Sequence, residues 1–126
     1  MKKYLVELIG TFFLVFTIGS TVMAPWAGPL APIAIGAALM VMVFAGGHVS
    51  GAHYNPAVTL AVFLRGKCDK ADVIPYWLAQ FAAAIVAALG DWLSYWFGFH
   101  YHSQIERMWP LSRSRWRFAC AGKAWR

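Results

Sequence analysis

The feature that most constrains this chain is an uncharged stretch from Leu8 to Leu64, which contains no Asp, Glu, Lys or Arg. A helix needs only about 20 apolar residues to cross a bilayer, so this stretch holds more than one spanning element. The whole chain is 60% hydrophobic and 13% charged, unlike the charge-rich composition of soluble domains. We therefore expect an integral membrane protein whose first partner is the lipid bilayer.

Three segments are apolar enough and long enough to be spanning helices. We expect them at about residues 4–24, 30–46 and 73–90, with Asp91 ending the third. Between the first two lies the segment PWAGPLAP, whose three prolines and one glycine predict a turn at the membrane surface.

The segment GGHVSGAHYNPAVTLAVFL, residues 46–64, is polar at its start and apolar at its end. Pro56 suits the first position of a helix, and the nine residues PAVTLAVFL would reach about 13 Å, less than half of a roughly 30 Å hydrocarbon core. We expect a re-entrant element, in which GGHVSGAHYN enters as irregular backbone, bent at Gly46, Gly47 and Gly51, and a half-helix returns. Because such backbone at membrane depth must be buried in protein or line a watery cavity, the segment predicts a pore.

The basic residues divide into two groups. Five of the eleven lie at the ends of the predicted spans, on one side of the membrane: Lys2, Lys3, Arg65, Lys67 and Lys70. The positive-inside rule then predicts a cytoplasmic N-terminus in the cell (inner) membrane. The other six lie between Arg107 and Arg126, and three crossings would place them outside, against that rule.

Residues 91–126 have no sustained apolar run and carry five of the seven tryptophans. We expect a repeat-like domain at residues 1–90 and a disordered or interfacial tail at 91–126. Binding of anionic lipid or single-stranded nucleic acid by the tail is the alternative, but we expect no nucleic-acid partner. The charge of the tail suggests a frameshift or truncation near Gly90 in the gene for a longer channel. Translation of the downstream nucleotides in the other frames tests this, and absence of a second Asn-Pro-Ala there would refute it.

Asn55, directly before Pro56, has two possible roles. It could be a plain N-cap. Alternatively, its side-chain N–H groups could donate to a passing oxygen, beside a helix N-terminus whose partial charge of about +0.5 repels cations. In the second case the backbone carbonyl groups before it would accept hydrogen bonds along the path: those of Gly51, Ala52, His53 and Tyr54.

Three segments together indicate a family. SGAHYNPAVT resembles the first re-entrant loop of the aquaporins and glycerol facilitators, the major intrinsic protein family, while ELIGTFFLVF resembles their first helix and YWLAQFAAAIVAAL their third. The resemblance extends from about Lys3 to Leu89. It implies passive conduction of water or small neutral solutes such as glycerol, with Asn55, Pro56 and Ala57 at the pore. It implies no enzyme and no cofactor.

The resemblance also implies roles for other residues. The family's matching glutamate accepts hydrogen bonds from the backbone of the re-entrant loop, so we expect Glu7 to brace that loop; an interfacial position and proton relay are the alternatives. We expect the rings of His48 and His53 to bond to nearby backbone, and no metal site, since no carboxylate or thiolate is near. Ile35 matches a position of the selectivity filter that is usually aromatic in water-selective members. Its alternative is a lipid-facing or core isoleucine.

Family members have two inverted repeats, each with Asn-Pro-Ala, and a filter arginine after the second. None of the second repeat is found after Asp91. We therefore expect an all-α membrane protein with three transmembrane helices and one re-entrant half-helix, which is half of the inverted-repeat fold. Its pore would be incomplete without a second half-channel or a further copy in a homo-oligomer. The alternatives are a non-conducting truncated fragment or assembly partner and, less favoured, a secondary transporter.

Overall fold

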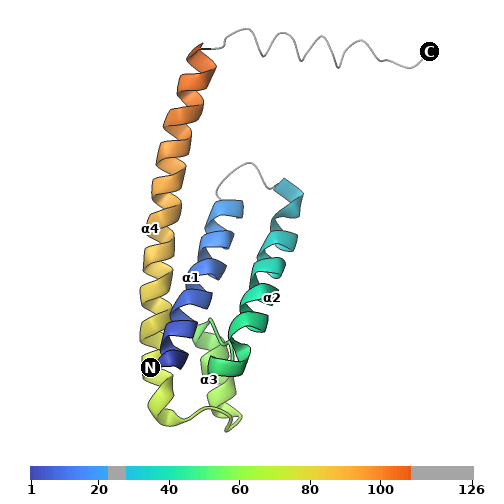
Figure 1. Cartoon of the computed structure of the whole chain (residues 1–126), viewed down its shortest axis with the longest axis vertical. Coiled ribbons are helices and arrows are strands. Elements are labelled where there is room, and N and C mark those ends of the chain that lie inside the picture. Colours follow the sequence, from blue (N-terminus) through green and yellow to red (C-terminus); the bar gives the residue numbers. More distant parts are fainter. Residues whose placement is uncertain (23–27, 109–126) are drawn as a thin grey trace, which may run out of the picture. The chain divides into compact units, whose positions relative to one another are not determined.

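The computed structural model describes the backbone of residues 1–22 and 28–108, and side chains as far as Gly98 (Figure 1). The elements are α1 (Lys2–Val22), the short 3-10 helix η1 (Gly28–Leu30), α2 (Ala31–Ser50), α3 (Pro56–Leu64) and α4 (Lys70–Met108). The chain divides into two compact units, Met1–Tyr95 and Trp96–Arg126. The contacts given below lie within the first unit. The tail predicted to be disordered or interfacial lies outside the described residues from position 109 onward.

Three helices in the described part are long and apolar enough to cross a membrane: α1, α2 and the segment Lys70–Gly98 of α4. The fourth, α3, has nine residues and reaches only about 13 Å. No strand occurs among the described residues. The predicted fold class, an all-α membrane protein with three spans and one half-helix, is therefore confirmed.

The predicted end of the second span is wrong. Helix α2 continues past Gly46 and Gly47 to Ser50, so the irregular backbone is confined to residues 51–55. Glycine is tolerated in spanning helices because the bilayer core offers the backbone no competing hydrogen-bond partner. The helix ends where Gly51 adopts a left-handed conformation with φ of +86° and donates its N–H to the Gly47 carbonyl.

The third helix does not end at Asp91 as predicted, because α4 continues through Asp91 to Met108. Asp91 is buried, and its Oδ1 accepts a hydrogen bond of 2.6 Å from the Ser20 hydroxyl of α1. A Cβ atom on Gly19 would overlap the Asp91 carboxylate, so the glycine leaves the space that the carboxylate fills. A carboxylate bonded to a neighbouring helix does not require its own helix to end.

Helix α4 packs one stripe of side chains against α1. The buried members recur every three or four residues, as expected for one helical face: Val73, Tyr76, Gln80, Ala83, Ala87 and Asp91. Two members of this stripe, Ala83 and Ala87, are small and fully buried or nearly so, and small residues are typical of the contact faces of spanning helices. The positions of the polar members on α4 are therefore fixed relative to α1.

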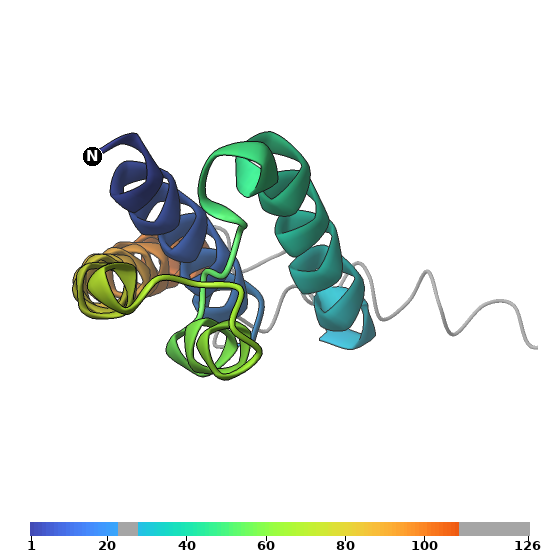
Figure 2. The same cartoon turned by 90° about the horizontal axis from the view of Figure 1, so that it is seen from below.

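One end of this unit carries an ion pair between α1 and α4. The Lys3 ammonium pairs with Asp72, which also accepts a hydrogen bond of 2.8 Å from the Tyr4 hydroxyl. The start of α1 and the α3–α4 connection thus lie at the same end, as Figure 1 shows. Seen from that end, the loop 51–55 leads from the end of α2 to the start of α3 and crosses in front of α1 (Figure 2).

Candidate functional site

Helix α3 begins with a capped N-terminus. Asn55 is extended, with φ of −153°, and its Oδ1 accepts a hydrogen bond of 2.8 Å from the N–H of Ala57. Pro56 has no N–H, so it leaves none unpaired at this helix start. The Asn55 side chain is exposed, and its Nδ2 donates to none of the described residues. The cap therefore uses the oxygen of the amide and leaves the nitrogen available.

The loop before Asn55 is held by a single carboxylate from α1. Glu7 is fully buried, and its Oε1 accepts hydrogen bonds from the Ser50 hydroxyl (2.7 Å) and the His53 N–H (2.9 Å). Its Oε2 accepts from the Tyr54 N–H (2.7 Å) and the Gln80 side-chain amide (2.8 Å). Hydrogen bonds to a charged acceptor are about twice as strong as neutral ones. Four of them compensate the burial of the charge.

The loop backbone is strained at two positions. Ala52 and Tyr54 have φ of 52° and 50°, a left-handed conformation that costs non-glycine residues of order 1–3 kcal/mol each. Such strain persists only where surrounding bonds fix the backbone. Here the Tyr54 N–H bonds to Glu7, and the Ala52 N–H donates 3.1 Å to the Ser50 hydroxyl. The strained conformation turns the chain from α2 into α3 within residues 51–55.

The Tyr54 side chain fills a gap between α1 and α2. It is only 3% exposed, and its hydroxyl donates 2.8 Å to the backbone carbonyl of Met42. A Cβ atom on Gly10 or on Gly46 would overlap this side chain. The two glycines therefore form the slot that Tyr54 occupies. Gly46, which the sequence suggested as a bend, serves as a packing surface.

A second polar cluster lies on the α4 side of the loop. The fully buried Thr59 Oγ1 lies 3.2 Å from the Asn55 carbonyl, 3.0 Å from Gln80 Nε2 and 3.2 Å from His53 Nδ1. Gln80 can only donate here, so the single hydroxyl proton goes either to the Asn55 carbonyl or to His53. In the first case His53 carries its proton on Nδ1 and donates to Thr59. Either arrangement links α3, the loop and α4 through one hydroxyl.

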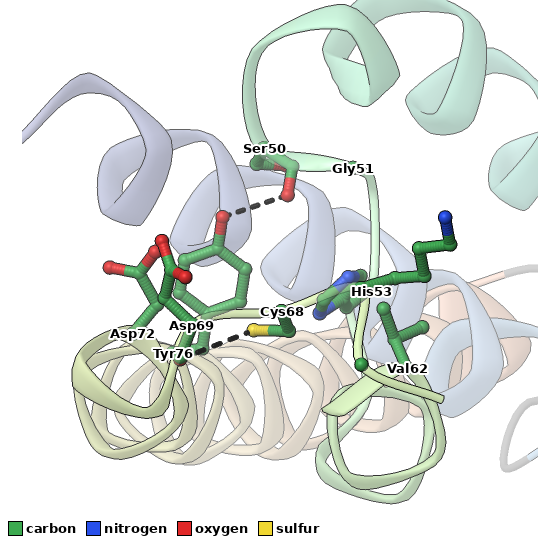
Figure 3. A pocket seen from close by; sticks show the side chains of 10 residues that line it. Ser50, Gly51, His53, Val62, Cys68, Asp69, Asp72 and Tyr76 are labelled. Carbon is green, nitrogen blue, oxygen red and sulfur yellow. Dashed lines mark hydrogen bonds between the residues drawn. The ribbon is translucent and has the colours of Figure 1, made fainter. Parts of the chain in front are cut away.

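Two aromatic residues of α4 hold backbone carbonyls next to the loop. The Tyr76 hydroxyl donates 2.7 Å to the Ser50 carbonyl, and the Trp77 indole donates 3.1 Å to the Pro56 carbonyl. Figure 3 shows Tyr76 reaching Ser50 across a pocket of about 560 Å³ that His53 and Cys68 also line. The start and the end of the loop are thus both attached to α4.

Comparisons with known proteins identify the family of this chain. The model of the family described as "Major intrinsic protein" matches residues 1–104. The chain belongs to the major intrinsic protein family. It is 46% identical over 89 residues to "Glycerol uptake facilitator protein-like 6" of Lactiplantibacillus plantarum, which covers 70% of this chain and 41% of that protein. It is 43% identical over 95 residues to "Aquaporin Z" of Bradyrhizobium diazoefficiens, covering 70% and 40%.

The chain therefore spans about two fifths of the length of these relatives. Major intrinsic proteins such as aquaporins and glycerol facilitators are channels, not enzymes, which agrees with the predicted class. The spanning helices and the family together make this chain an integral membrane protein.

The structure brings most of the predicted site residues of this major intrinsic protein together. The loop and cap residues lie side by side at the start of α3, with the Glu7 carboxylate behind them: Gly51, Ala52, His53, Tyr54, Asn55, Pro56 and Ala57. His48 lies apart, on an exposed face of α2, and its ring bonds to none of the described residues. Ile35 is half-buried on α2, twenty positions before Asn55.

Several contributors to the site were not singled out from the sequence: Ser50, Thr59, Tyr76, Trp77 and Gln80. Gln80 had a visible signal, since an amide in an otherwise apolar span needs a partner. The signal at Thr59 was weaker, because a single hydroxyl in a helix can bond to the backbone of its own helix.

Proposed function

We propose that this chain is half of a passive membrane channel for water or small neutral solutes such as glycerol. The observation that carries the proposal is the α3 N-terminus, whose cap is held by the Glu7 carboxylate through the N–H groups of His53 and Tyr54. Asn55, at the start of this nine-residue helix, is exposed, and a polar helix end that protein does not bury at membrane depth is tolerated where it lines a water-filled cavity.

The chemistry of that helix end suits neutral solutes. Asn55 uses Oδ1 for the cap, so its Nδ2 can donate to a passing water or hydroxyl oxygen. The carbonyls of the loop, residues 51–54, supply acceptors. The partial positive charge of a helix N-terminus repels cations, including protons. Neutral hydrogen-bonding molecules therefore pass this point more readily than ions do.

We assign Glu7 a structural role in this channel, as the sequence comparison implied. Its carboxylate is fully buried and binds four donors. A proton relay needs a group that solvent can reach and that exchanges partners. The contacts of Glu7 instead fix the loop that positions Asn55.

We further propose that the conducting form contains a second half. The chain spans about two fifths of its relatives, and among the described residues α3 is the only half-helix. Large apolar side chains remain exposed on the helices around the loop, among them Phe13, Phe44 and Leu60. A second half-channel, or another copy in a homo-oligomer, would cover them. A non-conducting fragment or assembly partner is the second candidate.

Orientation and organisation are further parts of the proposal. We place the lysine-bearing end, at Lys2 and Lys3, in the cytoplasm and the protein in the cell membrane. Residues 1–90 form the family-like repeat and 91–126 a separate basic tail, although the α4 backbone continues across that boundary. Ile35 as an aliphatic filter residue favours passage of solutes larger than water.

The test is an osmotic assay on vesicles that contain the full chain, alone or co-expressed with the second half of a relative such as the Bradyrhizobium aquaporin Z. We expect swelling faster than in empty vesicles only with the second half present. Asn55→Asp keeps the cap oxygen but removes the amide donors, and it should abolish the increase. Swelling equal to empty vesicles in every combination would refute a channel and leave the non-conducting fragment.

Solute selectivity is tested by the same assay with glycerol outside. We expect glycerol to enter the two-part channel, and Ile35→Phe to slow glycerol entry more than water flow, because a larger ring narrows the path. If Ile35→Phe slowed glycerol entry and water flow equally, Ile35 would not be a residue of the selectivity filter.

A further inference from the structure

Two polar contacts between α1 and α4 are separated by similar lengths on both helices. Lys3 pairs with Asp72 near the start of α1, and Ser20 bonds to Asp91 near its end. At 1.5 Å per residue the two contacts are about 26 Å apart along α1 and about 29 Å apart along α4. A bilayer has a hydrocarbon core of roughly 30 Å. The two contacts therefore have the spacing of the two membrane surfaces.

Beyond Asp72, large exposed side chains that carry a polar group begin on α4 at the second contact. Between Asp72 and Asp91 the large exposed ones are purely hydrocarbon: Ile74, Leu78, Phe81, Ile85, Val86 and Leu89. Directly beyond Asp91, Leu93 is also exposed, at 45%, but here the first large exposed side chains with a polar group occur, Trp92 at 57% and Tyr95 at 51%. They are three residues apart and so lie on one helical face. Each combines an apolar ring with one polar group.

We propose that Trp92 and Tyr95 bind the lipid headgroup region of the leaflet opposite Lys3, so that the membrane surface crosses α4 at Asp91. Tryptophan and tyrosine favour this region because their rings lie in the acyl boundary while the N–H or O–H reaches polar headgroups. The candidate span Lys70–Gly98 then crosses the hydrocarbon core only between Asp72 and Asp91.

Lipid fits this surface better than a protein partner does. Beyond Asp72, large exposed side chains that carry a polar group first occur directly after the Ser20–Asp91 contact, about one bilayer thickness from the Lys3–Asp72 ion pair. A protein partner would give no reason for these side chains to begin one bilayer thickness from the ion pair. Leu89, one turn earlier, is as exposed as Trp92, at 57%, so the chemistry of the side chain changes while its exposure does not. The proposal does not depend on whether the chain conducts.

The experiment measures depth at matched positions of the full chain. In a Cys68→Ser, Cys120→Ser background, single cysteines replace Ile85, Leu89 or Trp92, which are similarly exposed at 62%, 57% and 57%. A nitroxide on each is measured in phosphatidylcholine vesicles by its collisions with oxygen and with a water-soluble nickel chelate. We expect oxygen to dominate at Ile85 and nickel at Trp92, with Leu89 between and a total depth difference of about 10 Å.

Two results would overturn the proposal. A nitroxide at Trp92 as deep as that at Ile85 would place the surface further along α4. A nitroxide at Trp92 shielded from both reagents, while that at Ile85 meets oxygen, would show that protein covers the face. Tyr95→Cys is the second reporter if Trp92→Cys fails to insert. Because Tyr95 lies beyond Trp92 on α4, collisions with nickel should dominate over collisions with oxygen for its nitroxide as well.

Discussion

The Glu7 carboxylate accepts a hydrogen bond of 2.7 Å from the backbone N–H of Tyr54, the residue directly before the helix-capping Asn55. The carboxylate comes from the first helix, and the donor has a left-handed backbone, with φ of 50°. The position of the α3 N-terminus is thus set by a side chain 47 residues away in sequence.

Replacement of Glu7 by glutamine tests this bond. Glutamine offers one oxygen and one NH₂ group where the carboxylate accepts four donors, so at least one donor faces another. Each buried donor left unpaired costs about 1–3 kcal/mol. We expect a clearly lower thermal unfolding midpoint in detergent, measured by circular dichroism. Asp69→Asn makes the same chemical change at an exposed site and should leave the midpoint unchanged; equal midpoints for both variants would contradict the bracing role.

The glycine slot for Tyr54 gives a second prediction. Gly10→Ala and Gly46→Ala each place a methyl group against the Tyr54 side chain, and overpacking of this kind costs about 1–3 kcal/mol. Gly36→Ala on α2 is the matched control, because a Cβ atom there meets nothing within 4 Å. Alanine favours a helix over glycine, so the control should keep or raise the unfolding midpoint. A higher unfolding midpoint in all three variants would show that the space beside Tyr54 can hold an added methyl group.

Removal of the Tyr54 hydroxyl isolates one bond of the loop. Tyr54→Phe keeps the ring in its slot but loses the hydrogen bond to the Met42 carbonyl. A typical hydrogen bond contributes about 0.5–1.5 kcal/mol net, so we expect a smaller loss of stability than for Gly10→Ala. Unfolding in denaturant measures the difference. A loss larger than that of the glycine variants would mean that the hydroxyl, and not the ring, holds the loop.

Thr59→Val replaces the shared hydroxyl with a methyl group of similar size. The buried amide of Gln80 then loses an acceptor, and His53 Nδ1 loses its partner, at a cost of about 1–3 kcal/mol. Thr17→Val is the control, since the Thr17 hydroxyl bonds only to the Phe13 carbonyl of its own helix. We expect only Thr59→Val to lower the unfolding midpoint and to speed hydrogen exchange at the Thr59 amide. An equal change of the unfolding midpoint in both variants would indicate that the Thr59 hydroxyl stabilises only its own helix, as the Thr17 hydroxyl does.

Cys68, between α3 and α4, provides a pH-dependent readout. Burial, followed by the negative charges of Asp72 and Asp69, raises the pKa of its thiol. Only the thiolate attacks a maleimide, so a raised pKa means a smaller reactive fraction at neutral pH. In a Cys120→Ser chain we expect the labelling rate to rise at higher pH than in a peptide of residues 65–70. Identical pH profiles would show that the folded chain does not bury the thiol.

The half-helix could be predicted from the sequence because its signals are local. A proline at the first position, an asparagine cap and the charge at Arg65 gave the bounds of α3, Pro56–Leu64. The spans could also be predicted, since length and hydropathy suffice.

The failures come from information that is not local. Gly46 looked like a bend, but it faces a tyrosine eight residues later. Asp91 looked like a helix end, but its carboxylate has a partner on α1. The roles of Thr59 and Gln80 depend on how α3 lies against α4, which no single segment specifies.

Because synthesis starts at the N-terminus, Glu7 is made well before the groups that bind it. When α1 first reaches the bilayer, Ser50, His53 and Tyr54 are not yet folded against it, and Gln80 follows 73 residues after Glu7. A lone carboxylate in hydrocarbon is costly, so the first helix places Glu7 stably in the membrane only once α2 and the loop pack against it. The last donor comes only with α4. The carboxylate that fixes the finished loop thus also makes the stable insertion of the first helix dependent on segments that come later in the chain.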